Sequence, residues 1–492
     1  MCEFDQVDDA IVAEIFLWLL AQRAPGPSTD CDERFAVQAA TRFARTCKRI
    51  HGVWETTPDV WALVDAGRLL ETPTRQLAWC RKLTLLPGAV PAGDLSTRMP
   101  NLTALRARLI GNKDIVGVAK SLASLAHLED LEFGFEDLPV VPAHFEITLE
   151  HVKTLWLGCI GPAVRTVLGG CPGLTRLCLH WWTSAGELRA VWDMCPGLQS
   201  LDVFIGDVYA LEESGPETAK CARTLEELTI SVAFPEDQTR GIELVCRCFP
   251  NIVVLDLCRE IVHPSTVRAI ATLRRLESLR ISISVSGDTS AMSSELTALG
   301  HTAGAPFRRI ALGGTRADVG GFLSSPRCSR LRELDIVGTP FITWPDVATA
   351  TSTITSLRVE LVQDVLPTCI PYLMARCQNV EVLDLLPASN EQLREVGLYH
   401  NMAPRIAKLR LHNYCVTEEG FRGIAPILQH VAQLTIDCSG AGRITVDDIA
   451  KLVDGCPYVH ELVVHKDWNS EPFARAVGAK IRENIFIVAM NS

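Results

Sequence analysis

A short apolar frame recurs along most of this chain. It consists of an apolar residue, two variable residues, an apolar residue, one variable residue and a third apolar residue. Clear copies begin at Leu174, Leu198, Leu225, Leu276 and Leu331. Its central position marks about 16 copies, at residues 83, 105, 131, 155, 177, 201, 228, 255, 279, 310, 334, 357, 383, 409, 434 and 462. The mean spacing of about 25 residues is typical of a repeat protein.

The frame predicts what each repeat folds into. Alternation at its last three positions predicts a short strand with one buried face. A helix is expected in the rest of the unit, because Leu188, Val191 and Trp192 are spaced three and four apart before Cys195-Pro196. One unit cannot bury its apolar side alone, but stacked units share a continuous core. We therefore predict an α/β solenoid with parallel strands on the concave face and helices on the convex face.

The segments Gly170–Leu174 and Met194–Leu198, both Cys-Pro-Gly-Leu at their ends, resemble the cysteine-containing leucine-rich repeats. The resemblance covers about residues 80–470 and implies a leucine-rich-repeat solenoid. Four cysteines occupy the same place in their units, which predicts buried structural thiols rather than ligands or nucleophiles: Cys171, Cys195, Cys377 and Cys456.

Composition narrows the class of protein. The chain has 18 cysteines but no CxxC motif, so we expect a reduced intracellular protein, in the cytoplasm, the nucleus or both. The lone pair Cys246 and Cys248 is either structural or a metal site, and without a second cluster we favour the former. A net charge of −11 argues against nucleic-acid binding. No apolar run is long enough for a membrane span, and the acidic N-terminus argues against export.

Three regions follow from the pattern. Residues 1–70 contain no repeat frame and predict two amphipathic helices, near 11–20 and 35–53. Residues 75–465 form the predicted solenoid. Residues 466–492 are predicted to cap its open end and to finish in a strand at 485–488. Residues 1–70 are either the opposite cap or a separate small helical module.

The N-terminal region also resembles an F-box. Asp9–Leu20 is similar to the opening helix of that module, Ala44–Arg49 to its Val-Cys-Lys-Arg segment and Pro58–Trp61 to its closing Pro-x-Leu-Trp. The resemblance implies a substrate-recognition subunit of a Skp–cullin–F-box ubiquitin ligase, which binds a Skp-type adaptor and through it a cullin. Candidate adaptor-binding residues are Ile11, Ile15, Phe16, Leu19, Cys47 and Trp61. The alternative is a leucine-rich-repeat interaction scaffold without a ligase role.

Signatures of an enzyme are absent from the sequence. There is no GxSxG, GxxxxGK[ST], HExxH or GxGxxG. We therefore expect a non-catalytic receptor without a cofactor or a metal, which contributes by holding a protein substrate of unknown identity close to other subunits.

The residue between the last two apolar positions is expected to point from the concave face. In order these residues are Thr84, Arg106, Glu132, Trp156, Cys178, Asp202, Thr229, Asp256, Arg280, Ala311, Asp335, Arg358, Asp384, Arg410, Thr435 and Val463. Charges alternate from Asp256 to Arg280 and from Asp335 to Arg410. The row is either a self-paired ladder or a polar recognition strip, in which case Arg280, Arg358 and Arg410 bind substrate.

Trp156 is a large aromatic residue in this row. Arg176, His180, Trp181 and Trp182 lie on the next repeat. Aromatic residues beside arginine are typical of interface hot spots. We name Trp156, Arg176, His180 and Trp182 as further substrate-binding candidates, with packing of Trp181 and Trp182 under the loops as the alternative.

Overall fold

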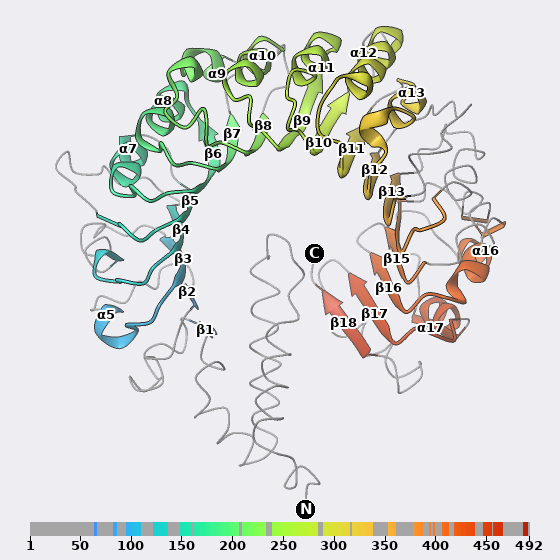
Figure 1. Cartoon of the computed structure of the whole chain (residues 1–492). Coiled ribbons are helices and arrows are strands. Elements are labelled where there is room, and N and C mark those ends of the chain that lie inside the picture. The colour runs from blue at the N-terminus through green and yellow to red at the C-terminus, as the bar shows by residue number, and fades with distance from the viewer. Residues whose placement is uncertain are drawn as a thin grey trace, which may run out of the picture. The chain divides into compact units, whose positions relative to one another are not determined.

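The computed structural model divides into two units, Met1–Leu225 and Glu226–Ser492, each built from parallel strands and helices (Figure 1). All the predicted repeat markers fall in strands. The structure describes residues 63–65, 82–85, 95–109, 122–135, 148–158, 162–205, 209–232, 239–283, 289–314, 317–337, 353–360, 377–386, 393–394, 397–398, 406–412, 418–437, 446–454, 456–465 and 486–490.

Seven described strands run through the first unit, and each pairs in parallel with the next strand in the sequence. The markers align across them, because Leu83, Leu105, Leu131, Leu155, Leu177 and Leu201 are successive register partners. The strands are β1 (Leu63–Asp65), β2 (Lys82–Leu85), β3 (Ala104–Leu109), β4 (Asp130–Phe135), β5 (Thr154–Gly158), β6 (Arg176–Thr183) and β7 (Ser200–Ile205).

The second unit repeats the arrangement. Its described markers are again successive partners, from Leu228 to Leu462. The strands are β8 (Glu227–Val232), β9 (Val254–Val262), β10 (Ser278–Ile283), β11 (Arg309–Gly313), β12 (Glu333–Val337), β13 (Ser356–Glu360), β14 (Val382–Leu386), β15 (Lys408–His412), β16 (Gln433–Asp437), β17 (Glu461–His465) and β18 (Phe486–Met490).

Helices form the second layer of each unit (Figure 1). In α8, a capping box between Ser184 and Glu187 starts the helix. The first unit has α5 (Leu95–Arg98), α7 (Pro162–Gly169), α8 (Ala185–Met194), α9 (Ala210–Glu213) and η4 (Pro216–Thr218). The second has α10 (Thr239–Cys248), α11 (Pro264–Ile270), α12 (Thr289–His301), α13 (Gly320–Leu323), η5 (Pro326–Cys328), α16 (Glu418–Leu428) and α17 (Val446–Asp454). A helix is wider than the strand spacing, so each unit curves toward its strands.

The apolar frame forms the core. The first position of the frame is fully buried in several repeats. Examples are Leu198, Leu276 and Phe307, which are each 0% exposed. Its central and last positions are also buried, as at Leu279 and Ile281. Each such side chain contributes about 1.5–3 kcal/mol through burial. The α/β leucine-rich-repeat solenoid predicted from the sequence is therefore confirmed, including the weak copies at residues 83, 105 and 310, which lie in register with the rest.

The Cys-Pro-Gly-Leu motif is a tight turn that leads into the strand. The N–H of Leu174 donates to the Cys171 carbonyl at 3.2 Å, and the N–H of Leu198 donates to the Cys195 carbonyl at the same distance. Proline suits the second position of such a turn, because its φ angle is already fixed near the required value. The turn places the cysteine side chain in the core.

A ladder of shared carbonyls joins the repeats where the strands begin. The Glu277 carbonyl accepts the N–H groups of Arg308 at 2.7 Å and Arg309 at 3.2 Å. The Arg332 carbonyl accepts those of Thr355 at 2.9 Å and Ser356 at 3.0 Å. Equivalent pairs recur along both units. Each new strand is therefore held at its first residue and at the residue just before it by one carbonyl of the preceding repeat.

The four cysteines predicted to be structural are buried, with exposures between 0% and 2%. Cys328 takes the same place before its strand and is also fully buried, a member that the sequence reading missed. Burial raises the pKa of the Cys171 and Cys377 thiols to about 12. Because the thiolate is the reactive form, these thiols are chemically inert at neutral pH.

Two expectations for the ends of the solenoid can be compared with the structure. The final strand is present as β18, which pairs with β17. In the N-terminal region, β1 pairs with β2, so the sheet begins before residue 70, and residues 63–65 form a strand rather than a helix. The two predicted N-terminal helices and residues 466–485 of the predicted C-terminal cap lie outside the described residues.

Candidate functional site

The outward-facing side chains of the strands form the candidate site. In β7 and β12 the marker is buried while the residues on either side of it are more exposed. Each strand therefore presents one residue before its marker and one after it on the same face. The row predicted from the sequence consists of the residues that follow the markers. Its members are register partners on neighbouring strands within each unit.

In the first unit the row brings Glu132, Trp156, Cys178 and Asp202 onto neighbouring strands. Glu132, Trp156 and Asp202 are half-buried, and Cys178 is 5% exposed. Burial raises the pKa of Cys178 above its ordinary value, and the charge of Asp202, a hydrogen bond to that residue and the charge of Glu132 act in the same direction. This thiol is therefore a neutral filler between acidic neighbours.

The other residues of the predicted patch around Trp156 lie on β6. Arg176 is exposed and begins that strand as the partner of Thr154. The register of β6 against β7 shifts between Leu179 and Trp182, so His180 and Trp181 form an irregularity of the strand. The side chains of His180, Trp181 and Trp182 lie outside the described part of the structure, and both readings of this patch stay predictions.

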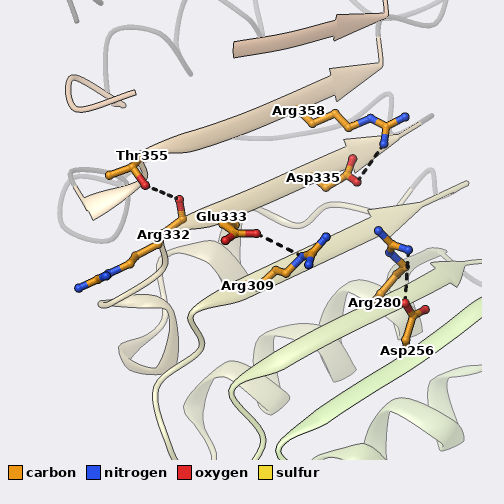
Figure 2. A network of polar contacts seen from close by, with 8 residues as sticks. All are labelled: Asp256, Arg280, Arg309, Arg332, Glu333, Asp335, Thr355 and Arg358. Carbon is orange, nitrogen blue, oxygen red and sulfur yellow. Dashed lines mark hydrogen bonds and ion pairs between the residues drawn. The ribbon is translucent and has the colours of Figure 1, made fainter. Parts of the chain in front are cut away.

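In the second unit several charged residues of the row form ion pairs, two of which Figure 2 shows. Arg280 Nη1 lies 3.3 Å from Asp256 Oδ2. Arg358 contacts two aspartates, with Nη1 3.8 Å from Asp335 Oδ2 and Nε 3.8 Å from Asp384 Oδ2. The next strand, β15, continues the row with Arg410, which is exposed. The alternation of charge seen in the sequence thus corresponds to ion pairs from Asp256 to Arg280 and from Asp335 to Asp384.

A second row lies one position before the markers, and the sequence reading passed over it. Arg309 Nε contacts Glu333 Oε2 at 3.4 Å across β11 and β12 (Figure 2). Lys408 follows in the same row on β15 and is exposed. The signal for this row is present in the sequence, since two-residue alternation places both flanks of a buried marker on one face.

The ion pairs of this face are loose. Their separations of 3.3–3.8 Å exceed the roughly 2.7–2.9 Å of a charge-assisted hydrogen bond. Asp335 Oδ1 is buried and accepts no hydrogen bond, and Arg358 Nε is buried and donates none. Burial raises the pKa of Asp335, while Arg358 and Arg280 lower it and Asp384 raises it further. The attraction within the ladder therefore does not fully offset the cost of burying this carboxylate.

Among the residues that the structure describes, no three His, Cys, Asp or Glu side chains are grouped so as to hold a metal ion. Cys246 is buried and Cys248 is partly exposed. No described helix has both the length and the apolar character needed to cross a bilayer. The six adaptor-binding candidates, from Ile11 to Trp61, lie outside the described residues.

Known proteins resemble this chain only distantly. No family model and no curated protein matches the sequence. Among solved structures, the yeast Rad7–Elc1 complex is 13% identical, with 77% of this chain and 88% of that chain covered and a TM-score of 0.41. The complex of TLR13 with ssRNA13 is 14% identical, with coverage of 84% and 64% and a TM-score of 0.43. The protein LegL7 from Legionella pneumophila is 14% identical, with coverage of 82% and 98% and a TM-score of 0.27. The fold assignment therefore rests on the strand register and burial described above.

Proposed function

We propose that this protein is the substrate-recognition subunit of a Skp–cullin–F-box ubiquitin ligase. Its strand face would bind the substrate, and its N-terminal region would bind the adaptor. The observation that carries the proposal is the pair of outward-facing rows, which bring polar side chains from consecutive strands onto one face. The three F-box-like segments lie directly before these repeats in the sequence.

The proposed role requires no chemistry from this chain. Ubiquitin transfer belongs to other subunits, and the receptor accelerates it by holding the substrate close to the reacting centre. A rigid solenoid suits this task, because each strand is fixed by the carbonyl ladder of its neighbour.

The adaptor interface is tested by Phe16→Asp. A charge in the apolar face of the N-terminal helix should abolish co-purification of the Skp-type adaptor and the cullin. The matched control is Leu398→Asp, the same kind of change at a side chain that is 69% exposed within the repeats. The control should retain the adaptor. Capture of the adaptor at the wild-type level by Phe16→Asp would contradict the assignment.

A second candidate function is supported by β1. This strand lies within residues 1–70 and extends the sheet of the repeats, as the terminal cap of an ordinary interaction scaffold does. The scaffold has no ligase role, so the wild-type chain should then capture partners on its strand face but neither adaptor nor cullin. The same co-purification experiment separates the two functions.

A further inference from the structure

Positive and negative charges lie at different depths on the strand face of the second unit. The aspartates Asp256, Asp335 and Asp384 expose only 12–20% of their side chains. Arg280 and Arg358 expose 38% and 40%. The carboxylates therefore lie beneath the guanidinium groups, and a partner that approaches this face meets the cations first.

The basic residues of the two outward rows form a surface that we call the arginine strip. It consists of Arg280, Arg309, Arg358, Lys408 and Arg410, on strands β10 to β15. The acidic residues in the same two rows between β9 and β15 are Asp256, Glu333, Asp335 and Asp384. The five basic residues outnumber the four acidic ones, so these two rows have a slightly positive net charge within a chain whose net charge is −11. Of the four acids, only Glu333 is as exposed as the arginines.

Arg358 also retains hydrogen-bonding capacity. A guanidinium carries five N–H donors in a planar fork. Both ion pairs of Arg358 are 3.8 Å long, and its side chain is 40% exposed, although its Nε, which donates no hydrogen bond, is buried. Arg309 contacts Glu333 at 3.4 Å and is 52% exposed. These groups can turn toward a carboxylate or phosphate and form shorter, paired hydrogen bonds with it.

We propose that the arginine strip binds an extended acidic peptide through two carboxylate or phosphate groups placed four residues apart. The inference rests on the proposed function, since it assigns the chemistry of the substrate to the same strand face. Arg280 on β10 and Arg358 on β13 are three strand spacings apart, or about 14 Å. An extended peptide covers about 13 Å in four residues and returns its side chain to the same side.

Binding of synthetic peptides to the full chain tests this assignment. The probe is Gly-Ser-Glu-Ser-Ser-Ser-Glu-Ser-Gly with a neutral fluorophore, measured by fluorescence anisotropy. A second probe carries phosphoserine in place of each glutamate and distinguishes phosphate from carboxylate as the natural group. Two control peptides replace both glutamates with glutamine or place them three residues apart. We expect each control peptide to bind about tenfold more weakly than the peptide with two glutamates four residues apart.

Protein variants locate the site. Arg280→Gln with Arg358→Gln should weaken binding of the acidic peptide about tenfold. The matched control is Arg268→Gln with Arg394→Gln, which removes the same charge from ion pairs with Glu295 and Glu419 on other surfaces of the second unit. This control should bind like the wild type. If loss of Arg358 prevents folding, Arg309→Gln with Arg410→Gln provides the same test at exposed positions.

The outcomes separate this inference from the ligase role. Equal binding of the glutamate and glutamine peptides, or no binding of either acidic probe, overturns the proposed chemistry. If the adaptor still co-purifies in that case, the ligase function stands and only the substrate class is wrong. Binding of acidic peptide by a chain that captures no adaptor would instead retain the arginine strip and remove the ligase role.

Discussion

Replacing Arg327 with methionine should destabilise the second unit near β11, because this arginine joins two repeats from within the core. Its side chain is 3% exposed. Its Nε donates to the Ala305 carbonyl at 3.0 Å and its Nη2 to the Leu276 carbonyl at 2.8 Å. The guanidinium lies 4.1 Å from the centre of the Phe307 ring. Phe307 itself fills the first frame position of its repeat.

The magnitude follows from these contacts. Two hydrogen bonds from a cationic donor contribute about 1.5 kcal/mol each, and the contact with the Phe307 ring contributes about 1 kcal/mol. Burial lowers the pKa of the Arg327 guanidinium, so removing the charge also relieves a desolvation cost, and the net loss is smaller than the sum of these contacts. The expected net loss is about 3 kcal/mol. Arg327→Lys should lose a similar amount, since an ammonium cannot reach both carbonyls at once.

Hydrogen exchange is the appropriate assay, because repeat proteins open locally. The N–H of Ala305 donates to the Arg274 carbonyl, and that of Phe307 donates to the Arg327 carbonyl. Both amides should exchange about a hundredfold faster in Arg327→Met. The control is Arg308→Met, which breaks an ion pair with Glu277 at a side chain that is 68% exposed and should cost less than about 1 kcal/mol. Equal exchange in the two variants would refute the reasoning.

Two further predictions concern titratable groups. In the native protein, Cys171, Cys195 and Cys377 should not react with a thiol reagent at pH 8, because burial raises their pKa to about 12. The same thiols should react in urea, and mass spectrometry locates the labelled residues. Rapid labelling of any of the three in the native protein would contradict the burial argument. Asp335→Asn should gain stability relative to the wild type as pH rises from about 4 to 7. The pKa of Asp335 in the folded state is raised above its ordinary value of 3.8, so the folded protein binds more protons than the unfolded chain in this window, and wild-type stability falls as pH rises through it. Urea midpoints of both proteins at several pH values measure the difference, which should grow with pH rather than stay constant.

The register of the sheet could be predicted from the sequence, because one frame carries both the strand and its buried face. Even Ile310, a weak match, pairs with Leu279 and Leu334 as its position requires. The cysteine sites could be predicted for the same reason. Their environment is repeated, so the place of the cysteine before the strand indicates the others, although Cys328, which no proline follows, was missed.

Other features depend on distances that a frame does not encode. The alternating signs of Asp335, Arg358 and Asp384 indicated ion pairs, but not that the acids would lie deeper than the arginine. Arg327 lies outside the frame, and its role depends on carbonyls of two earlier segments. Strand β1 was missed because residues 63–65 follow a segment that resembles another module.

The carbonyl ladder has a consequence for how the repeats can change in length. Hydrogen bonds hold the Cys-Pro turn, the residue before the strand and the first strand residue, so one inserted residue between Cys195 and Leu201 would turn the strand to its opposite face. Marker spacing nevertheless ranges from 22 residues, between Leu83 and Leu105, to 31 residues, between Leu279 and Ile310. This variation must be accommodated after each strand and in the following helix. New loops grafted at the ends of the strands should therefore leave the register intact, which makes that edge the place to build or alter specificity.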